Sequence, residues 1–193
     1  MILGNTHPAQ ATRPGWRGPL LVVAGLAVLA GTCAAATATV VAVGFNGAIL
    51  ASPDGLSWTT QPSGTGAGLL SVAAYGNQWV AVGSVGIVLT SPDGYSWSVL
   101  GSLTPQWLYG VATDGNVWVA VGGGGVIFRS TNGVAWFPQS SGTTQQLNAV
   151  ATDGTQWIAV GTAGTILTSP DGTTWTPRAS GTTNALRGVT ALY

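Results

Sequence analysis

The sequence contains very few charged groups and very few of the side chains that carry out acid–base chemistry. Lysine and glutamate are absent, the five basic residues are all arginine, the five acidic residues are all aspartate, and the net charge is zero. A nucleic-acid-binding protein needs a basic surface, so that class is excluded. A polybasic cluster that would bind acidic lipid is missing too. Cys33 is the only cysteine, so no disulfide can form within the chain.

The first 38 residues differ from the rest of the chain. Arg13 and Arg17 precede an apolar run that begins at Leu20, and small residues follow it up to Ala38. A positive segment, an apolar segment and Ala-x-Ala sites in this order are typical of a Sec-type signal peptide. We therefore expect residues 1–38 to direct export to the periplasm, the cell surface or the medium.

Two alternatives to a cleaved signal peptide stay open. The run from Leu20 to Ala36 reaches the short limit for crossing a bilayer, so an uncleaved membrane anchor is one alternative. Lipidation of Cys33 is the other, although Thr32 stands where a lipidation motif has Gly, Ala or Ser. Contact with a membrane is expected only through this N-terminal segment.

After residue 38 the chain repeats itself every 39 residues. A fixed period of about 40 residues with strand-like contents is the sequence signature of a β-propeller. Tryptophans and glycines mark the period, namely Trp58, Trp97, Trp136 and Trp175; Trp79, Trp118 and Trp157; and Gly44, Gly83, Gly122 and Gly161.

Each repeat contains four predicted strands and no helical periodicity, so the fold class is all-β. In the fullest copy the strands are predicted at 108–113, 117–121, 126–130 and 134–137. Asp114-Gly115 between the first two is a hairpin signal, because tight turns need residues that tolerate positive φ. The second strand is apolar on both faces, as in Trp157–Gly161, which fits a blade packed between two neighbours.

The two ends of the chain together complete one repeat, which predicts a propeller of four 39-residue, four-stranded blades. Residues 186–193 align with the first strand of a repeat and Thr39 to Gly44 align with the second. A closed four-bladed monomer, a homodimer that forms an eight-bladed ring, and a fragment of a longer propeller all stay open. The predicted blades are 39–68 plus 186–193, 69–107, 108–146 and 147–185.

A second motif recurs once in each blade, between the third and fourth strands. It resembles the Asp-box of bacterial neuraminidase (BNR) repeats, in which Asp accepts backbone N–H groups, Gly supplies positive φ and Trp packs over the turn. Each aspartate lies on a separate blade, so we expect a structural role and neither a metal site nor a cofactor. The motif residues are Ser52, Asp54, Gly55 and Trp58; Ser91, Asp93, Gly94 and Trp97; Ser130, Asn132, Gly133 and Trp136; and Ser169, Asp171, Gly172 and Trp175.

The sialidases that carry Asp-boxes use an arginine triad, a Tyr–Glu pair and an acidic acid/base. This chain has no glutamate, and its remaining arginines are Arg129, Arg178 and Arg187. Glycoside hydrolysis commonly needs two carboxylates about 5–9.5 Å apart. Loss of His7 with the signal peptide would also leave no histidine for a triad or a metal. We therefore expect no sialidase activity and no enzyme.

The phrase Trp-Val-Ala-Val-Gly followed by Ser-x-Asp-Gly-x-x-Trp and Ser-Gly-Thr-Thr is also similar to the repeats of the photosystem II assembly and stability factor family, and of related bacterial repeat proteins. That resemblance implies an exported Asp-box propeller that binds protein and acts as an assembly scaffold. Protein is thus the expected partner class.

Candidate binding residues are those that differ between repeats on one face of the propeller. The loops there are rich in Ser, Thr and amides, which suits sugars or polar protein surfaces. Trp107 and Tyr109, two residues apart on one strand, can stack on a sugar ring or anchor a partner. The alternative is that Trp107 only covers the channel mouth. Gln146, Asn148 and Arg187 complete the candidate set, and a lectin-like carbohydrate binder is the alternative function.

Overall fold

The computed structural model describes residues 22–23, 26–27 and 39–192. Within these ranges the chain forms antiparallel strands and short 3-10 turns. No helix there has the length and apolar character that crossing a membrane requires. The predicted signal peptide lies outside the described residues, except for a small hairpin of β1 (Val22–Val23) and β2 (Leu26–Ala27).

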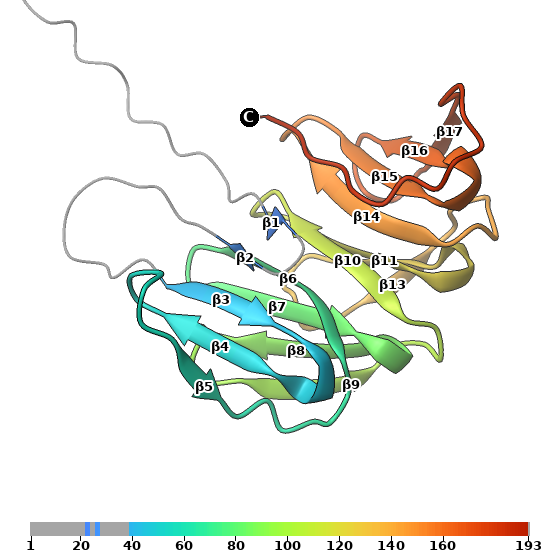
Figure 1. The fold of residues 1–193 in the computed structure, drawn as a ribbon. Coiled ribbons are helices and arrows are strands. Elements are labelled where there is room, and N and C mark those ends of the chain that lie inside the picture. The colour runs from blue at the N-terminus through green and yellow to red at the C-terminus, as the bar shows by residue number, and fades with distance from the viewer. Residues whose placement is uncertain (1–21, 24–25, 28–38, 193) are drawn as a thin grey trace, which may run out of the picture.

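Four consecutive blades account for residues 40–178, and they follow one another in an arc (Figure 1). The all-β propeller class and its four blades are thus confirmed. The first blade consists of β3 (Val40–Val43), β4 (Ile49–Ser52) and β5 (Thr59–Gln61). The second consists of β6 (Leu69–Tyr75), β7 (Gln78–Gly83), β8 (Ile87–Ser91) and β9 (Ser98–Ser102).

The third and fourth blades repeat the same order. They contain β10 (Leu108–Thr113), β11 (Trp118–Gly122), β12 (Ile127–Ser130) and β13 (Phe137–Gln139), then β14 (Leu147–Thr152), β15 (Trp157–Gly161), β16 (Ile166–Ser169) and β17 (Thr176–Arg178). A 3-10 turn links the second strand of each blade to the third: η1 (Phe45–Gly47), η2 (Ser84–Gly86), η3 (Gly123–Gly125) and η4 (Thr162–Gly164).

The predicted strand boundaries of the third blade differ from the structure by one residue at β11 and β12, and by more at the fourth strand. The fourth strand of the third blade was expected at 134–137, but β13 begins at Phe137. The backbone N–H groups of Val134 and Ala135 both donate to the side chain of Asn132, at 3.0 and 2.8 Å. Because these two N–H groups are bonded within the turn, they cannot pair with β12, and the strand starts only after the turn.

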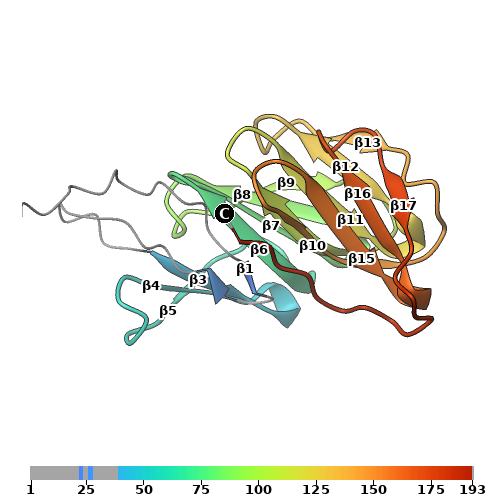
Figure 2. The same ribbon diagram turned by 90° about the horizontal axis from the view of Figure 1, so that it is seen from above.

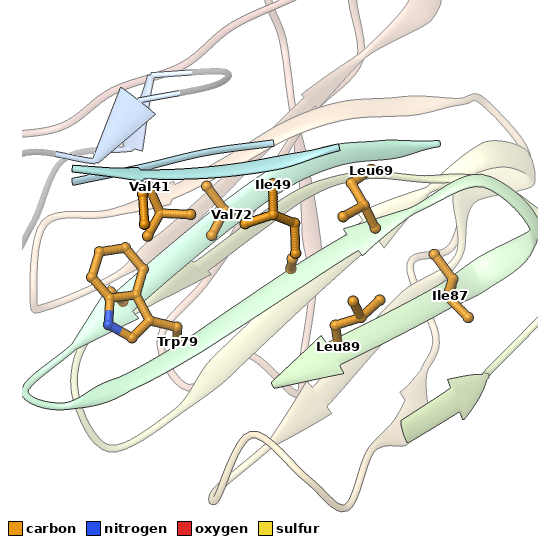
Figure 3. Packing of buried hydrophobic residues seen from close by; sticks show 10 residues of the cluster. Val41, Ile49, Leu69, Val72, Trp79, Ile87 and Leu89 are labelled. Carbon is orange, nitrogen blue, oxygen red and sulfur yellow. The ribbon is translucent and has the colours of Figure 1, made fainter. Parts of the chain in front are cut away.

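The hydrophobic core lies between the blades. Figure 3 shows Val41 and Ile49 of the first blade packed against Leu69, Trp79 and Leu89 of the second. Equivalent clusters fill the next two interfaces. Because the second strand is apolar on both faces, in the second and third blades it contributes to the core on either side of its sheet. Trp79, Trp118 and Trp157 are each only 2% exposed.

The two ends of the arc are open. The first blade has three strands, since β3 pairs only with β4 among the described residues. Residues 186–192 form no strand, so the pairing predicted between this segment and the first blade is not formed here. Leu186 stays with the fourth blade, where its N–H donates to the carbonyl of Gly161 at 2.9 Å. The assignment of residues 186–193 to the first blade stays a prediction.

Candidate functional site

The four turns that carry the Asp-box-like motif, called Asp-box turns below, share the acceptor geometry shown here for the second blade. The Oδ1 atom of Asp93 accepts the backbone N–H groups of Tyr95 at 2.8 Å and Ser96 at 2.7 Å. The hydroxyl of Ser91 donates to the same oxygen at 3.0 Å and accepts the N–H of Gly94 at 2.8 Å. The carboxylate is thus used to satisfy the turn that follows it.

These hydrogen bonds hold the aspartates in their charged form. The pKa values of Asp54, Asp93 and Asp171 lie below the ordinary value, chiefly because backbone N–H groups donate to each carboxylate. Asp153, in the turn between β14 and β15, has its pKa lowered to about 2, first by the hydroxyl of Thr155 and then by backbone N–H groups. Within the described ranges no three acidic, histidine or cysteine side chains gather as metal ligands would.

The face that carries the candidate binding residues is built from two kinds of loop. The 3-10 turns lie beside the loops that lead into each inner strand, and backbone bonds join them. The N–H of Gly123 donates to the carbonyl of Trp107, and that of Thr162 donates to Gln146, both at 2.9 Å. Serines such as Ser141, whose hydroxyl donates to the carbonyl of Thr143 at 3.1 Å, fold these loops back on themselves. We call this end of the molecule the loop face.

The aromatic pair predicted from the sequence is formed on the loop face. The ring centroids of Trp107 and Tyr109 are 6.2 Å apart, with the rings tilted by 43°. Trp107 is 42% exposed, and Tyr109 is half-buried. An exposed tryptophan that is supported on one side by a second ring offers a rigid apolar contact to a partner.

The two candidate amides, Gln146 and Asn148, bond to each other and are engaged within the chain. The side-chain N–H of Gln146 donates to Asn148 Oδ1 at 2.6 Å, and Asn148 Nδ2 donates to the carbonyl of Leu186 at 2.7 Å. Arg187 follows directly and is exposed. The two amides therefore hold the C-terminal segment against the fourth blade.

Two open grooves run between the loops of the loop face. One has a volume of about 800 Å³ and is lined by Ser141–Thr143, Ala163–Leu167 and Pro177–Thr183. The other, of about 660 Å³, lies between Gly124–Val126 and Gln139–Thr144. Sequence reasoning placed these loops on one face but did not single out Arg178, which lines the larger groove. A lone arginine on an outer strand carries no signal that it borders a groove.

No family model and no curated protein matches the chain. Among solved structures it is similar to YCF48 bound to D1 peptide, with a TM-score of 0.64 and 21% identity over 95% of this chain and 62% of that one. It is also similar to YCF48 from Cyanidioschyzon merolae, with a TM-score of 0.57 and 24% identity over 73% of this chain and 53% of that one. The chain thus spans between about half and three-fifths of these structures. The similarity shows a β-propeller fold of the YCF48 kind.

Proposed function

We propose that this chain is an exported, non-catalytic propeller that binds a protein partner on its loop face. The observation that carries the proposal is the exposed Trp107 ring, packed beside Tyr109 on that face. The arrangement of the acidic groups supports a non-catalytic role, because each Asp-box carboxylate serves its own turn. A propeller of this fold, YCF48, has been solved with a peptide bound, which also supports a protein partner.

A lectin-like carbohydrate binder is the second candidate. Sugar recognition needs amide and hydroxyl groups that are free to contact the ring substituents, and the loop face is rich in both. The amides of Gln146 and Asn148, however, already donate within the chain. This engagement favours a protein partner over a sugar.

Binding to short synthetic peptides, among them the D1 peptide seen with YCF48, tests the proposal. Trp107→Ala should weaken peptide binding by roughly 30-fold or more, as expected for an aromatic anchor. Phe137→Ala is the matched control, because Phe137 is 63% exposed but lies on the outer strand β13. That variant should bind as the wild type does.

Other outcomes would contradict the proposal in distinct ways. The lectin would be favoured if the chain bound glycans on an array, lost that binding in Trp107→Ala, and bound none of the peptides. Equal peptide binding by the wild type and Trp107→Ala would show that the aromatic pair is not part of the binding site. Turnover of a fluorogenic sialoside would overturn the non-catalytic role.

A further inference from the structure

Every interface between blades is built from the same two faces. One face of a blade, which we call the leading face, packs on the preceding blade; in the second blade it comprises Trp79, Ala81, Leu89 and Trp97. The opposite face, the trailing face, receives the next blade; in the first blade it comprises Val41, Val43, Ile49 and Ala51. The later interfaces use the same positions of the repeat.

The leading face of the first blade is covered near Val40, which is 7% exposed, and is open farther out along the blade. By the 39-residue period it comprises Val40, Ala42, Leu50 and Trp58. Leu50 is 38% exposed and Trp58 is 37% exposed, whereas Leu167 and Trp175, at the same positions of the fourth blade, are 1% and 8% exposed. These apolar side chains therefore lack the neighbour that their counterparts have.

The surroundings of the Asp-box glycine also show that the first blade lacks a preceding blade. A Cβ atom on Gly172 would stand 3.0 Å from Val119 of the preceding blade, whereas one on Gly55 would meet nothing within 4 Å. At the other end of the arc, the trailing face of the fourth blade is partly open. Ile158 and Ile166 are half-buried there, while Val119 and Ile127 at the same positions of the third blade are 0% and 1% exposed.

The strand missing from the first blade has a matching segment at the far end of the chain. Residues 186–192 read LRGVTAL, and the inner strand β14 begins LNAVAT. The N–H of Leu186 donates to Gly161 as the N–H of Leu69 donates to Gly44, both at 2.9 Å. Leu186 therefore begins as the inner strand of a blade that would follow the fourth.

We propose that two copies of this chain associate head to tail, each supplying residues 186–192 as the inner strand of the other's first blade. The trailing face of one copy's fourth blade then covers the leading face of its partner's first blade. The first and fourth blades of one copy lie at opposite ends of the arc in Figures 1 and 2, so a second copy supplies the neighbour. Because the net charge is zero, no net electrostatic repulsion opposes the association of two copies.

The register of the new pairing follows from the repeat. Val150 lies opposite Ala159 in the fourth blade, so Val189 should lie opposite Ala42 of the partner. The hairpin of β1 and β2 lies beside β3 and β6 but pairs with neither, so β3 has no ladder partner at this edge among the described residues, and an incoming strand would displace the hairpin. The arrangement does not depend on the proposed function of the loop face.

Light scattering on the full chain tests the association. The expected mass is twice the 19.3 kDa of one chain. Leu50→Asp should give a monomer with unchanged circular dichroism, because it places a charge on the open part of the leading face. Leu100→Asp is the matched control, since Leu100 is also 38% exposed but lies on the outer strand β9, and this variant should stay dimeric. A wild type that is monomeric at every concentration, or a dimeric Leu50→Asp, would overturn the proposal.

Disulfide formation between two single-cysteine chains tests the register, with Cys33→Ser in both. Ala42→Cys chains mixed with Val189→Cys chains should form a linked dimer, because opposed residues of antiparallel strands are about 4.5–5.5 Å apart at Cα. Leu192→Cys is the out-of-register control and should link far less. The absence of a mixed dimer, or closure within one chain when both cysteines are on it, would contradict pairing between copies.

Discussion

The Asp-box aspartate acts on the few residues that follow it. In the first blade Asp54 Oδ1 accepts the N–H groups of Leu56 and Ser57, both at 2.8 Å, and Asp171 does the same for Thr173 and Thr174. The third blade has Asn132 in this place, whose amide oxygen accepts two N–H groups in the same way. The turn therefore needs an acceptor at this position, and a negative charge is not required.

This equivalence predicts different costs for two substitutions of Asp93. Asp93→Ala removes the acceptor and should lower the free energy of unfolding by about 1 kcal/mol. Asp93→Asn keeps an acceptor, so it should lower the free energy of unfolding by less than half the loss in Asp93→Ala. Urea denaturation of both variants measures the difference. Equal losses in the two would show that the charge, rather than the hydrogen bonds, stabilises the turn.

The lowered pKa values predict that stability is lost only in acid. A carboxyl group whose pKa is lower in the folded chain than in the unfolded chain stabilises the fold above the unfolded value, near 3.9, and loses that contribution as the pH falls through the folded value. For Asp153 the folded value is about 2.

Thermal unfolding from pH 8 to pH 2 measures this dependence. We expect the Tm to be nearly constant above about pH 5 and to fall between about pH 4 and pH 2. The chain has no lysine or glutamate and only His7, so few other groups titrate near neutral pH. A large change in Tm between pH 6 and pH 8 would contradict this expectation.

Among the elements, the Asp-box turns of the third and fourth blades connect each of these blades to the one before it. Arg129 Nε on β12 donates to the carbonyl of Asp171 at 3.0 Å, and Gln78 Nε2 on β7 donates to the carbonyl of Asn132. The turn is thus both a cap within its blade and part of the interface between blades. The repeat predicted the cap, because its residues are local. The interface contacts could not be predicted, because they depend on side chains such as Arg129 that occur in only one blade.

Two glycines with the same backbone conformation separate these two roles. Gly172 and Gly55 both have φ of +74°, so alanine is strained equally at either position. Only at Gly172 does the new Cβ press on the preceding blade, through Val119. Gly172→Ala should therefore cost about 1–3 kcal/mol more than Gly55→Ala in the monomer.

Urea denaturation at protein concentrations that give the monomer measures this difference. Equal costs would mean that the strain at positive φ dominates and that the blade interface adapts. In the head-to-tail dimer Gly55 also gains a neighbour, so Gly55→Ala should weaken association there.

At the scale of the whole molecule, the fold was more predictable than the candidate binding site. The 39-residue period and the doubly apolar strands were sufficient to predict an all-β propeller with four blades. The aromatic pair was predicted because Trp107 and Tyr109 differ from the other repeats. The link from Asn148 to Leu186 was not, because it joins residues of two successive repeats through a backbone carbonyl that has no sequence signal.

The proposed export predicts a specific mature chain. The two Ala-x-Ala sites end at Ala36 and Ala38. Cleavage after one of these alanines would give a secreted protein that begins at Thr37 or Thr39. Intact mass spectrometry of the protein released by a secreting host measures the new N-terminus. A retained segment would favour the uncleaved anchor, and a lipid-modified N-terminus at Cys33 would favour a lipoprotein.

The identity of the blade interfaces has a consequence for how such a protein changes over generations. Each blade presents the same two apolar faces, so a gene that gains or loses one repeat of 39 codons leaves every remaining interface intact. A recombination error of that length would alter the size of the propeller without requiring any compensating substitution. A gain or loss of one repeat would therefore change the number of blades, whereas a change at a residue such as Trp107, at which one repeat departs from the others, would alter only its own blade.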